Sequence, residues 1–344
     1  MSNGNFLDFL PEEFESSFQD LFHEPPYRSR QILEQVYKRR IFNWENMSVL
    51  PLPLRSRSAD SYPLSLPRIK VKQVSMDGTV KYLFELADGI CVESVCIPES
   101  KRFTVCFSTQ AGCPVGCSFC ATGRGGFRRQ LSTAEIIGQI LAIEADTGEK
   151  MTNAVAMGQG EPLLNREQVF RAFRIFHDRR CLGMSSRHLT LSTVGIIPGI
   201  KELADSRLPC KLAVSLHSAR QEVRERLIPI SRLHPLTELK KALRYYVDAT
   251  KNRVTLEYLL LPGINDEKAD VKALLDFRKG LPVFLNLIPW NPVSGLEFTE
   301  PPEKAVRLFA ATLESNGFAV AIRKEKGGDI QAACGQLTQQ LLHA

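Results

Sequence analysis

Three cysteines with the spacing C-x3-C-x2-C constrain this chain more than any other feature; they are Cys113, Cys117 and Cys120. Thiolates at this spacing can bind one soft metal centre, and zinc and an iron–sulfur cluster are the usual occupants. A structural zinc site is closed by four protein ligands, but the next cysteine or histidine downstream is His177. A 4Fe-4S cluster with three cysteines leaves one iron open to a substrate or cofactor. The spacing therefore favours the cluster, with structural zinc as the alternative.

The cysteines follow a strand-like run, and from there strand-like and helical patterns alternate along the chain. The strand-like runs are residues 103–108, 153–158, 189–193, 211–216, 253–260 and 283–289. A capping box at Ser132 and Glu135 starts the helix after the cysteines. Strands that alternate with helices indicate an α/β fold with a parallel sheet. Six units cannot close an eight-stranded barrel, so we predict an incomplete (βα)6 barrel with its active site at the carboxyl ends of the strands.

Two smaller units precede this catalytic domain, which we place at residues 101–344. Residues 1–66 read as a helical accessory domain, in which the stretch Arg28–Arg40 forms a basic amphipathic helix. Its charged side chains either form a solvated face or contact RNA phosphates. Four prolines between residues 51 and 67 suggest a linker. Residues 67–100 read as a three-stranded meander, because Asp-Gly pairs at 77–78 and 88–89 are strong hairpin turns.

The composition is that of an ordinary globular protein, with 44% hydrophobic and 24% charged residues. No apolar run approaches the roughly 20 residues of a membrane span, and the N-terminus lacks the order of a signal peptide. We therefore expect a cytoplasmic protein with no membrane partner. Nine cysteines, an odd number, do not indicate a disulfide framework. The net charge of +6 suits a polyanionic partner without requiring one.

Polar and glycine residues follow several of the predicted strands. Gly160 and Glu161 come after the second strand, where a glycine lets the backbone approach a ligand and a carboxylate can bind an ammonium group. The other polar groups at strand ends are Ser192, Ser215, His217 and Asn291. Any one of them can be a residue that forms a turn, or a buried polar side chain that makes its hydrogen bonds within the core. Together they predict a polar rim around one cavity.

Two further cysteines and one glutamate are candidates for chemistry. Cys334 lies among small residues and glycines, which favours an accessible thiol over a core one. Cys106 lies on the strand that leads into the cysteine loop, where a buried packing role is the ordinary interpretation. Glu93 alternates with Val92 and Ser94 in the last strand of the meander, so its pattern alone predicts a solvent-facing carboxylate.

Taken together, these motifs resemble the RlmN family, which are adenine-C2 RNA methyltransferases of the radical S-adenosylmethionine type. The motifs are Glu93, Cys106, the cysteine loop, Gly160-Glu161-Pro162, Trp290-Asn291-Pro292 and Ala332-Ala-Cys334-Gly-Gln-Leu337. The resemblance runs over nearly the whole chain. It includes residues 27–32 and 42–47, which are similar to the family's RNA-binding accessory domain.

The resemblance implies two cofactors. A 4Fe-4S cluster would be bound by Cys113, Cys117 and Cys120, and two S-adenosylmethionine molecules would be consumed per turnover. The cofactor contacts that the resemblance implies are Gly160, Glu161, Ser192, Ser215, Leu216, His217 and Asn291.

The resemblance also implies a ping-pong mechanism. One S-adenosylmethionine methylates Cys334, and a second is cleaved by the cluster to a radical that takes hydrogen from the methylated cysteine. The carbon then adds to C2 of an adenine, and Glu93 is the base that removes the C2 proton. Cys106 attacks the sulfur of Cys334 and forms a disulfide, which releases the product.

The implied substrates are an adenine in 23S ribosomal RNA and one in tRNA. The adenine must leave its stack, so a deep pocket with a basic rim is expected. The candidates for this rim are Arg28, Arg30, Lys38, Arg39, Arg40, Arg124, Arg128 and Arg129. We further expect a flavodoxin- or ferredoxin-like electron donor and a monomer.

Two residues depart from the family pattern. Lys326 stands where the family usually has arginine, and Gln159 where it commonly has methionine. A lysine keeps the charge but loses the bidentate fork. We expect neither to touch the chemistry, although each can alter the choice of RNA. The alternatives are the C8-directing relative Cfr and a zinc-containing RNA-binding protein without activity.

Overall fold

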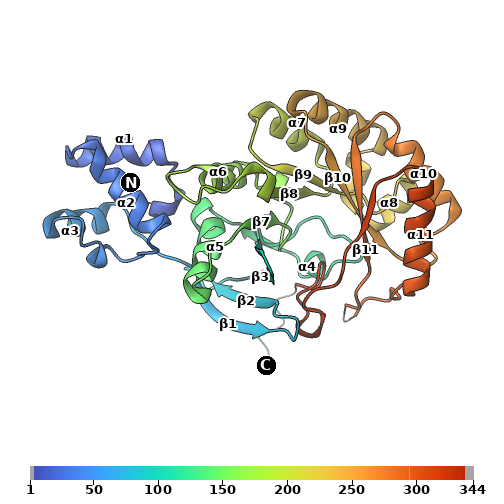
Figure 1. The fold of residues 1–344 in the computed structure, drawn as a ribbon, viewed down its shortest axis with the longest axis horizontal. Helices are drawn as coiled ribbons and strands as arrows, with labels where there is room; N and C mark the ends of the chain where they lie inside the picture. The colour runs from blue at the N-terminus through green and yellow to red at the C-terminus, as the bar shows by residue number, and fades with distance from the viewer. Residues whose placement is uncertain (1–3, 294, 338–344) are drawn as a thin grey trace.

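The computed structural model describes residues 4–293 and 295–337, and it has the predicted fold class (Figure 1). Its centre is a ten-stranded sheet in the order β1-β2-β3-β4-β7-β8-β9-β10-β11-β12. The parallel strands are β4 (Arg102–Cys106), β7 (Asn153–Ala156), β8 (Leu189–Thr193), β9 (Lys211–Ser215), β10 (Val254–Leu260), β11 (Val283–Pro289) and β12 (Val320–Ile322). The six predicted strands are confirmed. The short β12 was not predicted, and it continues the parallel sheet beyond β11.

Helices follow the parallel strands, as the alternating pattern predicts. They are α5 (Thr133–Thr147), α6 (Arg166–His177), α7 (Ile197–Ser206), α8 (Gln221–Leu227), α9 (Leu236–Thr250), α10 (Lys268–Arg278) and α11 (Glu303–Ser315). Ser132 caps α5 by accepting a hydrogen bond from the Glu135 N–H, so the predicted capping box is confirmed. The cysteine loop lies between β4 and α5, next to the small hairpin of β5 (Gln110–Gly112) and β6 (Phe127–Gln130) and the short α4 (Ala121–Arg124).

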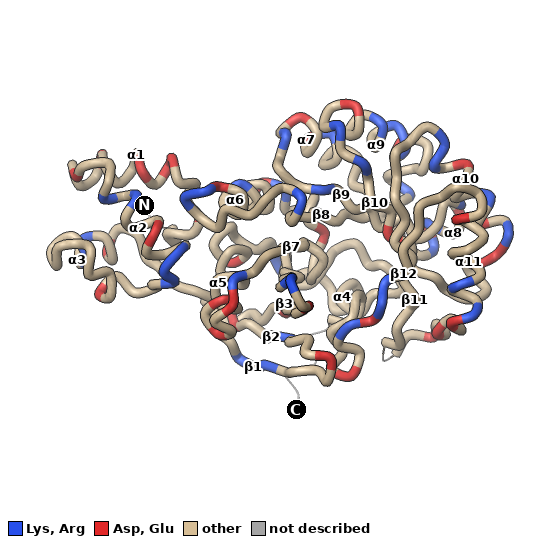
Figure 2. Tube along the Cα trace, viewed as in Figure 1, with Lys and Arg blue, Asp and Glu red and all other residues tan. Residues whose placement is uncertain are grey.

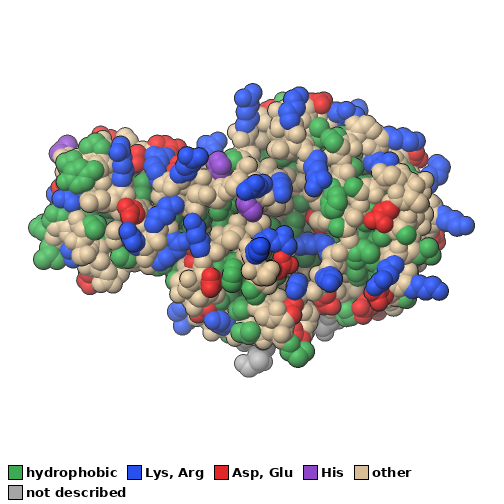
Figure 3. Space-filling model, in the orientation of Figure 1, with side chains coloured by type: hydrophobic (Ala, Val, Ile, Leu, Met, Phe, Trp, Pro, Cys, Tyr) green, Lys and Arg blue, Asp and Glu red, His purple; other side chains and the backbone are tan. Residues whose placement is uncertain are grey.

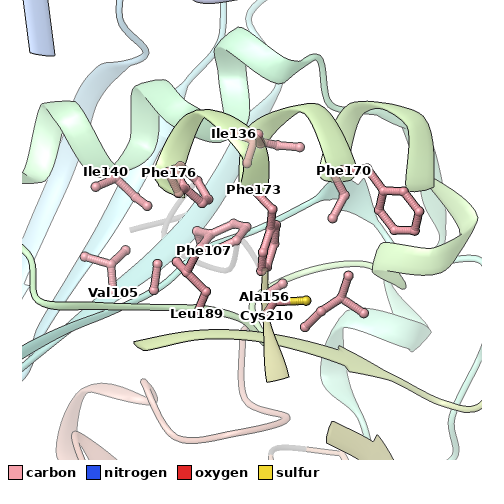
Figure 4. Close-up of a cluster of buried hydrophobic side chains, with 14 of the residues drawn as sticks. Val105, Phe107, Ile136, Ile140, Ala156, Phe170, Phe173, Phe176, Leu189 and Cys210 are labelled. Atoms are coloured by element: carbon pink, nitrogen blue, oxygen red, sulfur yellow. The ribbon is translucent and has the colours of Figure 1, made fainter. Parts of the chain in front are cut away.

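The core of the barrel lies between the sheet and the helices. Phe107, just after β4, contacts Phe173 and Phe176 of α6, and the Phe107 and Phe176 rings meet edge to face at 5.5 Å (Figure 4). All three side chains are fully buried. Replacing such a phenylalanine by alanine costs about 3–5 kcal/mol. This packing fixes the end of β4, and therefore the start of the cysteine loop.

The meander extends the barrel sheet. Its strands are β1 (Arg68–Val74), β2 (Val80–Glu85) and β3 (Cys91–Glu99), and all pairs from β1 to β4 are antiparallel. Because β3 pairs with β4, residues of the meander lie directly beside the strand that carries Cys106. The domain boundaries given above stay a prediction.

The N-terminal module lies at one side of the barrel (Figure 1). It consists of α1 (Pro11–Phe22), α2 (Pro26–Tyr37) and α3 (Leu52–Ser61), around buried aromatic side chains such as Phe14 and Trp44. The interpretation of residues 51–67 as a linker is wrong for the part that forms α3. Pro53 does not break this helix, because it lies in the first turn, where a missing N–H is tolerated. The Asp8 carboxylate accepts from the Ala134 N–H at the start of α5, which attaches the module to the barrel. No helix in the described ranges has the length and apolar character needed to cross a membrane.

Candidate active site

A cavity of about 780 Å³ lies at the carboxyl ends of the parallel strands. This volume is within the range of pockets that bind small molecules. The predicted residues that line it are Cys106, Cys120, Gly160, Glu161, Ser192, Ser215, His217, Asn291 and Cys334. Four other predicted residues are not in its wall: Glu93, Cys113, Cys117 and Leu216. The structure therefore brings most of the predicted rim to one cavity.

The cysteine loop lies against an apolar surface. Cys117 is buried among Val115, Leu227 and Trp290, whereas Cys113 and Cys120 are half-buried. Burial raises the pKa of the Cys113 thiol to about 12. A metal ion that binds such thiols displaces their protons.

The donor set fits a cluster better than a single ion. Among the described residues, no three His, Cys, Asp or Glu side chains gather closely enough to bind one metal ion. A closed zinc site needs four ligands around one ion, whereas the cysteines of a 4Fe-4S cluster bind through separate irons. Because Cys120 lines the cavity, a cluster bound by the loop would border it.

Glu161 is fully buried at the cavity with its carboxylate already engaged. It accepts hydrogen bonds from the Val194 N–H at 2.7 Å and the Leu163 N–H at 2.9 Å. Burial raises its pKa to about 7, although these hydrogen bonds oppose the rise. Gly160 has a φ of +105°, and a Cβ there would lie 2.6 Å from the Cβ of Gln110. The backbone can therefore only take this path with glycine, and a cationic ligand would keep Glu161 ionised.

The tautomer of His217 is fixed by a backbone hydrogen bond. Its Nδ1 accepts from the Leu259 N–H at 2.9 Å, so a neutral ring carries its proton on Nε2. Burial lowers the pKa of His217 to about 3, which keeps the ring neutral at physiological pH. The ring also meets the Phe119 ring edge to face at 4.7 Å. His217 therefore offers one N–H donor in the wall of the cavity.

Cys106 and Cys334 lie near one another although they are far apart in the sequence. Cys106, at the end of β4, packs against Ala332 and Leu337 of the C-terminal segment. Burial raises the pKa of Cys106 to about 12, and the charge of Cys334 contributes to the rise. Cys106 is buried and Cys334 is exposed. Both thiols are free in this structure, so the disulfide implied by the resemblance is not present.

Glu93 is buried, so the solvent-facing carboxylate that its alternation predicts is wrong. It lies on β3, where it is 1% exposed. The Lys81 Nζ lies 3.7 Å from the Glu93 Oε1, and the Gln159 amide donates to the Glu93 Oε2 at 3.3 Å. Gln159 therefore does touch the proposed base, contrary to the expectation for this departure.

Comparison with known proteins agrees with this geometry. Residues 107–275 match the model of the Radical SAM superfamily. The chain is 44% identical over 339 residues, 98% of this chain and 99% of the relative, to a probable dual-specificity RNA methyltransferase RlmN of Thermosipho melanesiensis. It is 41% identical to the dual-specificity RNA methyltransferase RlmN of Halorhodospira halophila, covering 96% of this chain and 92% of the relative. The chain belongs to the RlmN family.

A solved structure supports the same conclusion for the fold. A radical SAM methyltransferase from Sphaerobacter thermophilus is 38% identical and superimposes with a TM-score of 0.92 over 97% of this chain and 98% of that one. As an RlmN family member, the chain is a radical SAM RNA methyltransferase that uses a 4Fe-4S cluster and S-adenosylmethionine. The alternative of an RNA-binding protein without activity is therefore wrong.

Two charged residues of this RlmN site were not found from the sequence. Lys81 of β2 is 4% exposed, and it also donates to the carbonyl of Gln331 at 3.3 Å. The sequence signal that could have indicated a buried lysine is its position inside the otherwise apolar strand run 80–84. Arg323, just after β12, lines the cavity and lies 3.6 Å from Glu257. The pKa of Arg323 is raised, chiefly by the charge of Cys334.

The C-terminal segment is fastened to the hairpin between β1 and β2. Asp329 accepts from the Ser75 hydroxyl at 2.5 Å and from the Met76 N–H at 3.1 Å. Lys326 lies 3.7 Å from Asp77 in the same hairpin. A single ammonium is sufficient for this contact, which accounts for a lysine at this position. Figure 2 shows the alternating charges of this segment directly after β12.

The predicted basic rim is only partly available to RNA. Arg40 pairs with the buried Glu144. Arg129 pairs with Asp88 and with Glu135, and the nitrogen–oxygen distance is 2.7 Å in both of these Arg129 pairs. Arg124 donates to the carbonyl of Gly295. The predicted basic residues that are exposed are Arg30, Lys38, Arg39, Arg124 and Arg128. Lys and Arg side chains are spread over the face of the molecule shown in Figure 3.

Proposed function

We propose that this protein methylates C2 of an adenine in 23S ribosomal RNA and in tRNA, and that the methyl group passes through Cys334. The observation that carries the proposal is the pair of free thiols at one cavity. Cys106 and Cys334 come from opposite ends of the catalytic region, and each lines the cavity. Two thiols that meet in this way can form and break a disulfide during turnover.

The cofactor side of the cavity would be formed by two groups of residues. Cys113, Cys117 and Cys120 would hold the cluster, which supplies the electron for reductive cleavage of S-adenosylmethionine. Glu161 would bind the ammonium group of the methionine moiety, since its buried carboxylate lacks a cationic partner among the contacts described above. His217, with its Nε2 proton, would donate a hydrogen bond. The other proposed contacts are Gly160, Ser192, Ser215, Leu216 and Asn291.

Cys334 would act first, as a nucleophile. Its thiolate attacks the methyl carbon of the sulfonium, so that a carbon–sulfur bond forms as the bond to the sulfonium breaks. Arg323 lines the same cavity as Cys334, and its pKa is raised chiefly by the charge of Cys334. A second S-adenosylmethionine is needed for the radical step, so two are consumed per turnover.

Glu93 and Cys106 would complete the reaction. Glu93 takes the proton from C2 of the adenine after the methyl carbon has become attached. The Lys81 ammonium lies within 4 Å of the Glu93 carboxylate, and an opposite charge at this range favours the charged form of a carboxylate. The Cys106 thiolate then attacks the sulfur of Cys334, so that a disulfide forms as the bond between that sulfur and the bridging carbon breaks. The released carbon takes up a proton and becomes the methyl group of the RNA product. Reduction of this disulfide would prepare the protein for another turnover.

The C2 product is favoured over C8 by the names of the relatives, which are RlmN. We further propose that the protein acts as a cytoplasmic monomer, supplied with electrons by a flavodoxin- or ferredoxin-like donor. The target adenine would leave its stack to enter the cavity. Exposed basic side chains such as Arg30 and Arg128 would bind the flanking phosphates.

Mass spectrometry of the RNA product tests this proposal. The protein is reconstituted anaerobically with iron and sulfide and incubated with S-adenosylmethionine, a reductant, and fragments of 23S ribosomal RNA or tRNA. We expect 2-methyladenosine in both RNAs. An 8-methyladenosine product would overturn the choice of carbon, and S-adenosylmethionine cleavage without a methylated base would overturn the RNA substrate.

A further inference from the structure

Arg224 of α8 is a fully buried arginine with one unpartnered nitrogen. Its side chain is 0% exposed. Nε donates to the carbonyl of Leu216 at 3.2 Å and Nη2 to the carbonyl of Val194, but Nη1 has no hydrogen-bond partner among the described residues. Gly195 leaves room for this guanidinium, because a Cβ there would lie 3.2 Å from Nη2. The fold therefore accommodates a cation deep inside the barrel.

Nothing in the described ranges neutralises this cation. No aspartate or glutamate of residues 4–293 or 295–337 forms an ion pair with Arg224. The titratable neighbours on other elements are Cys117, His217 and His234. Burial, followed by the charge of Arg224, lowers the pKa of the two histidines. Burial lowers the pKa of Arg224 only to about 10, so it stays charged at neutral pH. An unpaired buried charge is costly, so an anion that binds nearby would be stabilised.

The cysteine loop lies directly against the helix that carries Arg224. Cys117 belongs to one buried apolar cluster with Val223 and Leu227, which lie one residue before and three residues after Arg224 on α8. The Ser118 N–H also donates to the carbonyl of Leu227 at 3.0 Å, which fixes the loop to the end of the helix. The loop that carries Cys117 is therefore packed on the helix that carries the unpaired arginine.

We propose that Arg224 is the resident counter-charge of the iron–sulfur cluster and raises the reduction potential of that cluster. This inference rests on the proposed role of Cys117 as a cluster ligand. One electron from a low-potential donor enters the cluster on reduction, so the site becomes more negative by one charge while no bond forms or breaks. A buried cation stabilises the reduced form more than the oxidised form, because net charge and surroundings set the potential. Arg224 is a positioning residue in this role, since it acts through the cluster and touches no substrate.

The test is a potentiometric titration of three variants without RNA or S-adenosylmethionine. Arg224→Met removes the charge, and Arg224→Lys keeps it while losing the forked hydrogen bonds to the Leu216 and Val194 carbonyls. The control is Arg226→Met, which removes an arginine from the exposed face of the same helix. Each protein is reconstituted with iron and sulfide, its iron content is measured, and the reduced cluster is followed by electron paramagnetic resonance. Activity of the enzyme is not needed for this readout.

We expect Arg224→Met to lower the ratio of reduced to oxidised cluster at a fixed potential by about tenfold or more, which is about 59 mV for a one-electron couple. Arg224→Lys and Arg226→Met are expected to stay near wild type. A potential that is unchanged in Arg224→Met, or lowered as much in Arg224→Lys, would overturn the inference. If Arg224→Met does not fold, Arg224→Gln, which removes the charge and keeps a hydrogen-bond donor, replaces it with the same expected fall. Failure of the wild-type protein to bind iron would instead overturn the proposed cysteine site.

Discussion

Lys81 of β2 and Glu93 of β3 form a buried ion pair, with 3.7 Å between Nζ and Oε1. Lys81 also donates to the carbonyl of Gln331, three residues before Cys334. One lysine therefore connects the proposed base to the segment that carries the proposed methyl acceptor. Burial lowers the pKa of Lys81, and the charge of Glu93 opposes this change.

Replacing Lys81 by Met should lower the rate of RNA methylation by about tenfold or more near neutral pH, because loss of the nearby ammonium favours the neutral carboxyl, which cannot act as a base. Methyl loading of Cys334 should persist, which is measured by the mass of the Cys334 peptide. Lys101→Met, at an exposed turn, is the matched control. A Lys81→Met enzyme with wild-type methylation would remove Lys81 from the mechanism.

The pKa of Glu161 predicts how stability depends on pH. The folded pKa of about 7 lies above the ordinary value of 4.5, so the folded protein without cofactors keeps a proton that the unfolded chain has lost. The stabilisation is present below about pH 4.5 and is lost as the pH rises through about 7. It is on the order of 3 kcal/mol. The free energy of unfolding, measured with urea, should fall between pH 5 and pH 8 for wild type and should fall less for Glu161→Gln. An equal fall in the two proteins would exclude Glu161 as the cause.

Replacing Cys106 by Ala should trap RNA on Cys334 through the methylene bridge, because no second thiol remains to attack the sulfur. The adduct should survive denaturing gel electrophoresis and disappear on digestion with ribonuclease. Cys96→Ala, a buried cysteine on β3 outside the cavity wall, serves as the control and should release its product. Free Cys106→Ala protein after turnover would contradict the role of Cys106.

Asp329 should control the order of the Cys334 segment. Asp329→Ala removes the hydrogen bonds that the carboxylate accepts from the Ser75 hydroxyl and the Met76 N–H. We expect faster amide hydrogen exchange in residues 327–334 and slower methyl loading of Cys334, with unchanged exchange in α5 and α6. If hydrogen exchange in residues 327–334 stays at the wild-type rate, the contact with the hairpin is not what keeps this segment ordered.

Much of the fold followed from local patterns. The Ser132–Glu135 capping box and the Asp-Gly turns depend on residues that are neighbours in the chain, and the structure has a helix and hairpins there. The cysteine loop was recognised for the same reason, since its spacing is local.

The features that the sequence did not reveal depend on contacts between distant segments. The burial of Glu93 requires Gln159 and Lys81, which come from other strands. Arg323 lines the same cavity as the two thiols because β12, which precedes it, adds to the sheet beside β11. Arg224 lies on an ordinary amphipathic helix, and only its burial behind the cysteine loop distinguishes it from Arg226.

A labelled-methyl chase tests the central claim most directly. The reconstituted protein is loaded at Cys334 with an isotopically labelled methyl group, freed of excess S-adenosylmethionine, and given RNA with unlabelled S-adenosylmethionine and a reductant. The account predicts that the first methyl group to reach the adenine carries the label, and that Cys334→Ala takes up no methyl group while retaining its cluster absorbance. An unlabelled first product would show that the methyl group does not pass through Cys334.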